Sequence, residues 1–120
     1  MHPSLFTSLS TFPRELEQLY SAVPESHTHW APASWEGVPS EMFTAVEQIC
    51  HIRDIEIEGY HVRLRRLLEE DNPVLVSIDS YQVAKDRRYP DGSPAEIFAA
   101  FRRAREVTVS IIASLTGAKR

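Results

Sequence analysis

Four titratable side chains in the segment 47–58 have a spacing that could support metal binding or acid–base chemistry. They follow the helical intervals i, i+4, i+7 and i+11, and are Glu47, His51, Asp54 and Glu58. A histidine beside carboxylates is typical of a metal ligand, because the carboxylate fixes the imidazole tautomer. It is equally typical of a polar helix face with a hydrogen-bonded histidine, which is the interpretation we favour. The Glu-x-x-His motif of di-iron bundles is absent, since Gln48 stands three residues before His51.

The other histidines and the single cysteine add little to this pattern. His61 lies ten residues after His51, about 15 Å along a helix and too far for shared coordination. His27 and His29 belong to a loop and could contribute only if that loop folds over the bundle end. Cys50 precedes His51, but adjacent residues on a helix point in different directions. We therefore expect a small buried side chain at Cys50 and no Cys-His nucleophilic pair.

A candidate arginine lies near the end of the chain. Phe101 and Arg105 are four residues apart and share one face of a predicted helix. Arg105 could bind a substrate in a pocket or form a structural ion pair. We expect the ion pair, either with the 47–58 stripe or with Glu96 or Glu106. The sequence contains no Gly-rich phosphate loop, no G-x-S-x-G elbow and no CxxC pair.

Three amphipathic helices must position these residues, which predicts an all-α bundle. The predicted helices cover residues 12–23, 40–70 and 93–116. Pro13 suits the first turn of the first helix, Ser40 is expected to cap the second, and Ser93 opens the third. The apolar side of the second helix is predicted to consist of Met42, Val46, Ile49, Ile52, Tyr60, Leu64, Leu67 and Leu68.

Two connections have distinct compositions. A long crossover, residues 71–92, joins the second and third helices, and its β-prone segment 74–78 has no partner strand, so extended chain is predicted. The loop 24–39 contains Trp30 and Trp35. We expect both to fold back as core aromatic residues, because each ring removes a large apolar area from water. Residues 1–120 are expected to form one helical domain.

The composition favours a soluble protein of the cytoplasm. The net charge is −4, which argues against a general nucleic-acid partner. No apolar run approaches the roughly 20 residues that span a bilayer, so no membrane partner is expected. The first residues lack the pattern of a secretory signal. The only cysteine, Cys50, permits no intrachain disulfide.

An ordered set of residues resembles the DinB/YfiT-like family. The set consists of Trp30, the APASW motif ending at Trp35, the ExxxHIxDxE motif from Glu47 to Glu56, Tyr89, and the FxxxR motif from Phe101 to Arg105. The resemblance covers residues 30–115 and implies a four-helix bundle with a long connection between the second and third helices. It also implies a divalent metal, such as zinc or nickel, bound by three histidines. Several members of that family are thiol-dependent transferases or isomerases.

The resemblance is incomplete at the metal site. His51 matches the ligand on the second helix, but the HxxxH pair of the fourth helix has no counterpart after Leu115. We therefore expect a bundle without the C-terminal fourth helix and with a divalent metal at low occupancy only. Three helices would leave an apolar groove, so we expect a homodimer in which two chains cover each other's grooves.

Two functions remain open at this point. The preferred prediction is a reduced, non-catalytic module that associates with itself. The alternative is a metal-dependent thiol transferase or isomerase whose remaining ligands come from a fourth helix or from another subunit.

Overall fold

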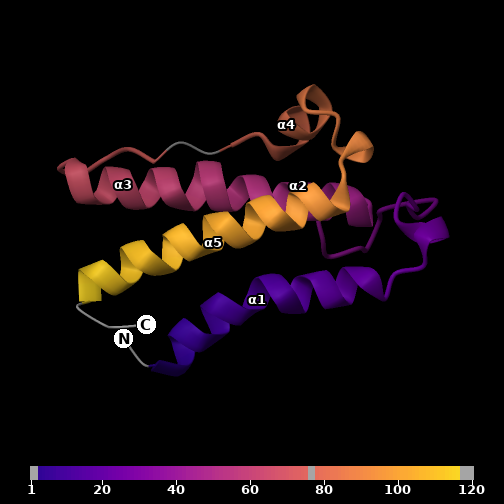
Figure 1. Ribbon diagram of the computed structural model, residues 1–120. Helices are drawn as coiled ribbons and strands as arrows, with labels where there is room; N and C mark the ends of the chain where they lie inside the picture. The colour runs from indigo at the N-terminus through magenta and orange to yellow at the C-terminus, as the bar shows by residue number, and fades with distance from the viewer. Residues whose placement is uncertain (1–2, 76–77, 117–120) are drawn as a thin grey trace.

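The computed structural model describes residues 3–75 and 78–116, and within these ranges it is all-helical with no strand. The predicted all-α class is therefore confirmed. Three long helical rods form the body (Figure 1). They are α1 (Pro3–Ser21), the continuous second helix made of α2 (Ala45–Asp54), η2 (Ile55–His61) and α3 (Val62–Glu69), and α5 (Pro94–Thr116). The short elements are η1 (Glu25–His27), α4 (Ser80–Asp86) and η3 (Tyr89–Asp91). None of the described helices combines the length and apolarity that crossing a lipid bilayer requires.

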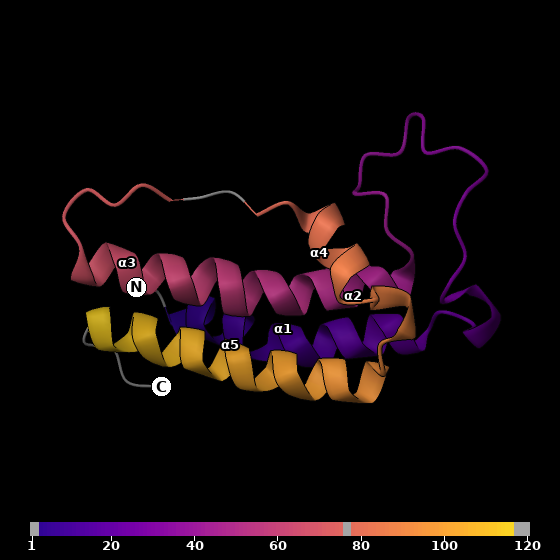
Figure 2. The ribbon, with the colours of Figure 1, turned by 90° about the horizontal axis from the view of Figure 1, so that it is seen from above.

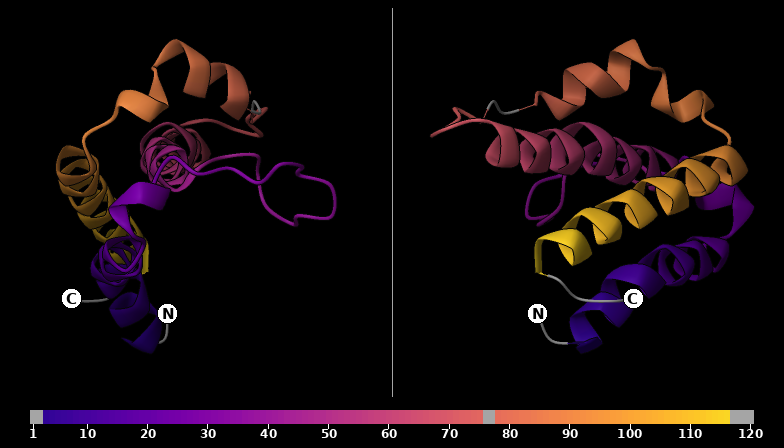
Figure 3. Two further views of the ribbon diagram at one scale, coloured as in Figure 1. Left: turned by 90° about the vertical axis from the view of Figure 1, so that its right-hand side faces the viewer. Right: turned by 60° about the vertical axis from the view of Figure 1, so that its left-hand side comes forward.

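Helix α5 is the central element, because both other rods pack mainly against it and far less against each other (Figure 3). One apolar cluster lies at its N-terminal end, where Ile97 and Phe98 meet Ile49 and Tyr89. A second, smaller cluster lies further along α5, formed by Phe6, Val109 and Ala113. Between the two clusters, α5 carries Arg105 and Thr108 into a polar network described below.

Helix α1 is longer than predicted. It begins at Pro3, so Pro13 lies in its interior and the prediction that Pro13 occupies the first turn is wrong. A proline has no N–H, so the carbonyl of Leu9, four residues earlier, lacks its helical partner. The Nη1 group of Arg105 donates a hydrogen bond to this oxygen at 3.1 Å. A side chain from α5 thus replaces the bond that the helix cannot make.

The second helix starts later than predicted. Its N-cap is Thr44 and not Ser40, in a complete capping box: the Thr44 side chain accepts from the Glu47 N–H, and the Glu47 side chain accepts from the Thr44 N–H. The four residues before Thr44 are irregular, with bends at Ser40 and Met42, and Phe43 enters the core from this segment at 7% exposure. A complete two-way box satisfies two backbone N–H groups, which a cap at Ser40 would not have done.

The centre of the second helix is a seven-residue π-helical segment, η2. Its i→i+5 hydrogen bonds shift the register of everything that follows relative to an α-helix. As a result, the predicted apolar side is buried in α2, at Val46 and Ile49, but not in α3, where Leu67 and Leu68 are exposed. The prediction from the sequence assumed an unbroken α-helical period, and it was wrong for the C-terminal half of this helix.

The third predicted helix is confirmed as α5, with Ser93 Oγ accepting from the Glu96 N–H at 3.5 Å. The crossover before it is not wholly irregular, because it contains α4, which Asp79 caps through the Gln82 N–H. The crossover runs back along the second helix before α4 begins (Figure 2). No strand forms in the described part of segment 74–78; residues 76–77 lie outside the described ranges.

The tryptophan-containing loop projects away from the bundle (Figure 2). Trp30 is 59% exposed, so its prediction as a core aromatic residue is wrong. Trp35 is only half-buried. The base of the loop is tied down, because the Val46 N–H donates to the Thr28 carbonyl and His29 Nε2 donates to the Pro90 carbonyl. These hydrogen bonds hold the base of the loop at the bundle rim. Phe43 therefore fills the core position that was predicted for the tryptophans.

Candidate functional site

The predicted polar stripe is divided among three environments. Glu47 is part of the capping box at the start of α2. Asp54 and Glu58 both bind Arg87, with Nη1 of Arg87 3.1 Å from Asp54 Oδ2 and Nη2 2.5 Å from Glu58 Oε1. Only His51 is left facing a different carboxylate, that of Glu41. The four side chains therefore do not converge on a common point.

Asp54 is the centre of a buried charge cluster. It is 8% exposed and accepts hydrogen bonds from Tyr89 Oη at 2.5 Å and from Arg53 Nε at 2.9 Å. Burial alone would raise the pKa of Asp54, but the hydrogen bonds from Arg53 and Tyr89 and the charges of Arg53 and Arg87 lower it below its usual value. Burial and the bond to Asp54 raise the pKa of Tyr89. The cluster fixes η3 against the second helix and gives both carboxylate oxygens of Asp54 partners within the protein.

His51 lies at the edge of the bundle core. Its Nε2 is 3.5 Å from Glu41 Oε1, and its ring centroid is 5.2 Å from that of Phe43. The neighbouring Cys50 is buried, as predicted, with its Sγ 3.7 Å from the Tyr89 carbonyl oxygen. Burial raises the pKa of the Cys50 thiol, which disfavours the reactive thiolate. Cys50 is thus a packing residue, whereas His51 retains one face toward a pocket.

That pocket is a groove of about 410 Å³ beside α1 and the second helix, which we call the α1–α2 groove. Its polar lining includes His51, Glu56 and Arg105, and its apolar lining includes Phe12, Ile52 and Tyr60. Tyr60 is 45% exposed although its position in the sequence predicted a core residue. In this groove the predicted candidates His51 and Arg105 line the same cavity.

Glu56 and Arg105 form a buried pair in this groove. Glu56 is 1% exposed, and its two carboxylate oxygens accept from Nε and Nη2 of Arg105, each at 2.9 Å. Thr108 adds a hydroxyl donor to Glu56 Oε2 at 2.5 Å. The guanidinium carbon of Arg105 lies 5.6 Å and 5.3 Å from the ring centroids of Phe12 and Phe101. A bidentate ion pair whose guanidinium lies between two aromatic rings is held in one orientation, which is typical of a structural role.

His61 extends the network on the side of α5. Its Nε2 lies 2.7 Å from the Ala104 carbonyl oxygen and 2.9 Å from Thr108 Oγ1. Because a carbonyl can only accept, Nε2 must carry the hydrogen. This one hydrogen is shared between the Ala104 carbonyl and the Thr108 hydroxyl, and the Thr108 hydroxyl donates its own hydrogen to Glu56. The network links α1, η2 and α5 at the middle of the bundle.

We expected an ion pair for Arg105 from the sequence, but its partner is not one of those predicted. The observed partner is Glu56. Glu56 lies between Asp54 and Glu58 in the sequence, but it is not one of the four residues of the predicted stripe, and it is neither Glu96 nor Glu106. A signal was present: Glu56 follows Ile49 and Ile52 at i+7 and i+4, so it occupies a core-facing position in an otherwise apolar stripe. A charge at such a position needs a partner from another helix.

The donor set around His51 does not fit a metal ion bound by three protein ligands. Among the described residues, no group of three or more His, Cys, Asp or Glu side chains is arranged to hold a metal. Glu41 is the acidic neighbour of His51, and Asp54 is fully engaged by Tyr89 and two arginines. His27 and His29 lie in and after η1, where their rings contact Ser26 and Thr28. A metal at His51 would therefore need ligands from outside these residues.

Comparison with known proteins identifies one relationship. The family model described as the DinB superfamily matches residues 8–119, almost the whole chain. No curated protein and no solved structure matches the sequence significantly.

Proposed function

Because this chain belongs to the DinB superfamily, we propose that it is a helical module of that superfamily which acts by association, with a second copy of the chain covering the α1–α2 groove. The observation that carries this proposal is the amount of surface the chain leaves exposed. A compact protein of 13.7 kDa exposes about 6,600 Å². This chain exposes 8093 Å², an excess of about 1,500 Å².

The shape of the molecule agrees with this excess. Its radius of gyration is 16.1 Å, whereas a compact domain of 120 residues has a value of about 14 Å. The projecting loop between α1 and α2 is one visible cause (Figure 3). Each partner in a standard interface buries about 800 Å². The exposed surface is thus sufficient for a stable dimer.

The chemistry of the groove favours a symmetric arrangement. Its walls offer the half-exposed aromatic ring of Tyr60 and the partly buried side chains of Ile52 and Ile55, while Glu56 and Arg105 neutralise each other below. The other charged side chains of the lining, His51 and Glu41, also face each other. A groove whose charged side chains are paired and whose remaining walls are largely apolar suits an apolar helix face. In a two-fold dimer each chain both offers and fills such a groove.

The test is sedimentation equilibrium of two matched variants. Tyr60→Glu places a charge in the groove, whereas Val107→Glu places one on α5 outside the groove lining; the two parent side chains are similarly exposed, at 45% and 48%. Tyr60→Glu is expected to weaken dimerisation by about tenfold or more, and Val107→Glu to leave it unchanged. A well-folded wild-type monomer at micromolar concentration, or equal losses in both variants, would contradict the proposal.

A second candidate function is a metal-dependent thiol transferase or isomerase. It is favoured by His51 and Glu41, whose side chains lie 3.5 Å apart in the same groove. The remaining ligands would come from a fourth helix or from another subunit. Metal analysis of purified protein distinguishes the two functions: association without catalysis predicts well under one divalent ion per chain. A stoichiometric ion that disappears in His51→Ala would favour the enzyme.

A further inference from the structure

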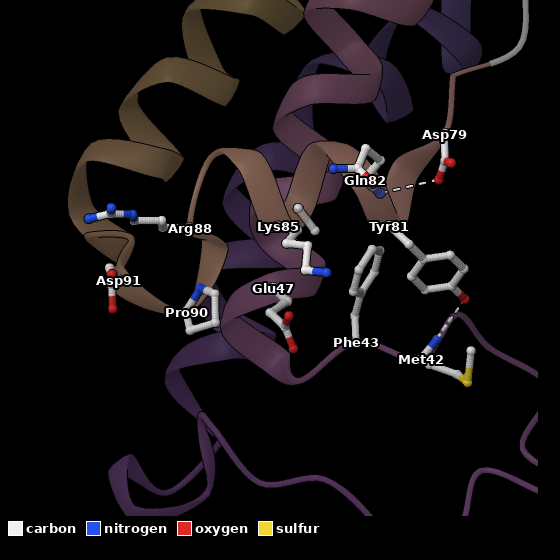
Figure 4. A pocket seen from close by; sticks show the side chains of 11 residues that line it. Met42, Phe43, Glu47, Asp79, Tyr81, Gln82, Lys85, Arg88, Pro90 and Asp91 are labelled. Carbon is white, nitrogen blue, oxygen red and sulfur yellow. Dashed lines mark hydrogen bonds between the residues drawn. The ribbon is translucent and has the colours of Figure 1, made fainter.

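A second pocket, of about 670 Å³, lies between α4, η3 and the start of α2 (Figure 4). It shares no lining residue with the α1–α2 groove. Its volume falls within the range of pockets that bind small molecules. We call it the α4 pocket.

One wall of the α4 pocket is aromatic. Phe43 is anchored in the core at 7% exposure, and its ring centroid lies 5.1 Å from that of Tyr81, which is 46% exposed. The Met42 N–H donates to Tyr81 Oη at 3.0 Å, which fixes the Tyr81 ring at the rim. Met42 itself is 54% exposed. The exposed part of this wall is therefore supplied mainly by Tyr81 and Met42, with Phe43 behind them.

Beside this wall stand two opposite charges that do not pair with each other. The Lys85 and Glu47 side chains both reach toward the hollow next to Phe43 (Figure 4). Within the described part of the chain, Lys85 has no ion pair or side-chain hydrogen bond. Glu47 uses Oε1 to accept from the Thr44 N–H at 3.0 Å, which leaves Oε2 available. A cation and a carboxylate thus face one cavity with space between them.

The other charged side chains of the pocket are less suited to a ligand. Asp79, whose Oδ1 accepts from the Gln82 N–H, lies beyond Gln82 and Tyr81 at the edge of the pocket and away from Glu47 (Figure 4). Arg88 and Asp91 lie together at the far end, beyond Pro90 (Figure 4). The centre of the pocket is therefore defined by one donor of positive charge, one carboxylate and an apolar wall.

From this arrangement we propose that the α4 pocket binds an α-amino acid with an apolar side chain. The ligand carboxylate meets the ammonium group of Lys85, the ligand ammonium group meets Glu47 Oε2, and the apolar side chain lies against Phe43 and Tyr81. A zwitterion supplies both missing partners at once, whereas a ligand with a single charge leaves either Lys85 or Glu47 unpaired. The apolar wall selects against small polar amino acids.

The experiment uses three ligands that share a phenyl ring and differ in charge. They are L-phenylalanine, 3-phenylpropanoate, which lacks the ammonium group, and phenethylamine, which lacks the carboxylate. Binding to the full chain is followed by the amide NMR shifts of Met42, Gln82 and Lys85. L-phenylalanine is expected to bind at least about fivefold more tightly than either singly charged ligand.

Two substitutions assign the charges separately. Lys85→Gln is expected to weaken L-phenylalanine and 3-phenylpropanoate but not phenethylamine. Glu47→Gln retains an acceptor for the Thr44 N–H and is expected to weaken L-phenylalanine and phenethylamine but not 3-phenylpropanoate. Arg65→Gln, on the exposed face of α3, is the charge-matched control and should change nothing. Equal affinities for the three ligands, no saturable binding, or the same pattern of losses in both variants would overturn the proposal.

Discussion

Arg105 occupies the hydrogen-bonding position that Pro13 leaves empty. Pro13 interrupts the hydrogen bonding of α1 at the Leu9 carbonyl, and the Arg105 guanidinium both donates to that oxygen and binds the carboxylate of Glu56. One side chain of α5 therefore connects a backbone defect in α1 with a buried charge in η2. The residue that the sequence marks as a possible substrate ligand is engaged on three sides by the protein itself.

Breaking the pair from one side should be costly. Arg105→Met leaves the carboxylate of Glu56 buried without a cation, and we expect a loss of about 3–5 kcal/mol in the free energy of unfolding. Glu56→Gln combined with Arg105→Met removes both charges and should be less destabilised than the sum of the two single variants. Urea unfolding of all four proteins measures this difference, and simple additivity would show that the two residues are not coupled.

Acid should weaken the Asp54 cluster. The pKa of Asp54 is lower in the folded chain than the ordinary value near about 3.9. The unfolded chain therefore takes up the proton first as pH falls, so the stability that Asp54 contributes is present above about pH 4 and is lost below it. Asp54→Asn should be destabilised at neutral pH, and its difference from the wild type should shrink in acid. Asp71→Asn, at an exposed site, is the control and should show no such change.

Alkali should act on the same cluster through Tyr89. Its pKa is raised by burial and by the bond to Asp54, so the folded state retains the neutral phenol above the ordinary value of about 10. The contribution of Tyr89 to stability is thus complete below about pH 10 and decreases above it. Of the four tyrosines, Tyr89 should be the last to show phenolate absorbance, and Tyr89→Phe should remove that late step. A late step that persists in the variant would contradict the assignment.

Replacement by alanine should have different effects at two glycines. A Cβ on Gly92 would lie 2.9 Å from Ile97 Cδ1 and 3.1 Å from Cys50 Sγ. Gly92→Ala should therefore cost about 1–3 kcal/mol through overpacking. A Cβ on Gly59 would meet only Ile55 Cγ2, at 3.6 Å, so Gly59→Ala should be neutral or should raise the melting temperature. Thermal unfolding compares the two, and an equal effect would contradict this account of Gly92.

The helical class was predictable because it depends on local patterns. The apolar period and the Ser93-Pro94 start define α5 almost to the residue, since capping and periodicity act over a few neighbouring positions. The full length of α1 was harder to predict from the sequence. A proline in its interior is tolerated only because Arg105, far away in the sequence, satisfies the Leu9 carbonyl. Rules that consider only neighbouring residues cannot predict such a distant partner.

The site was predictable in its members but not in its pairing. His51 and Arg105 do line one groove, whereas the stripe that contains His51 separates into different clusters. Glu47 accepts from the Thr44 N–H, His51 faces Glu41 and Asp54 accepts from Tyr89, so each has a different partner. The π-helical segment begins only at Ile55, so it explains the outward turn of Leu67 and Leu68 but not this separation. The prediction for Trp30 was wrong for a different reason: hydrogen bonds of Thr28 and His29 fix the base of its loop at the bundle rim. Aromatic content alone does not reveal which ring of the segment reaches the core.

The central place of α5 also has a consequence for how this protein is made. A ribosome releases α1 and the second helix before α5, which is the helix against which both of them pack. Until α5 emerges, the nascent chain carries two amphipathic rods that bury little surface against each other. Tertiary folding of α1 and the second helix must therefore wait for α5 to be synthesised, and until then these helices depend on low local concentration or on chaperones to stay apart from other nascent chains.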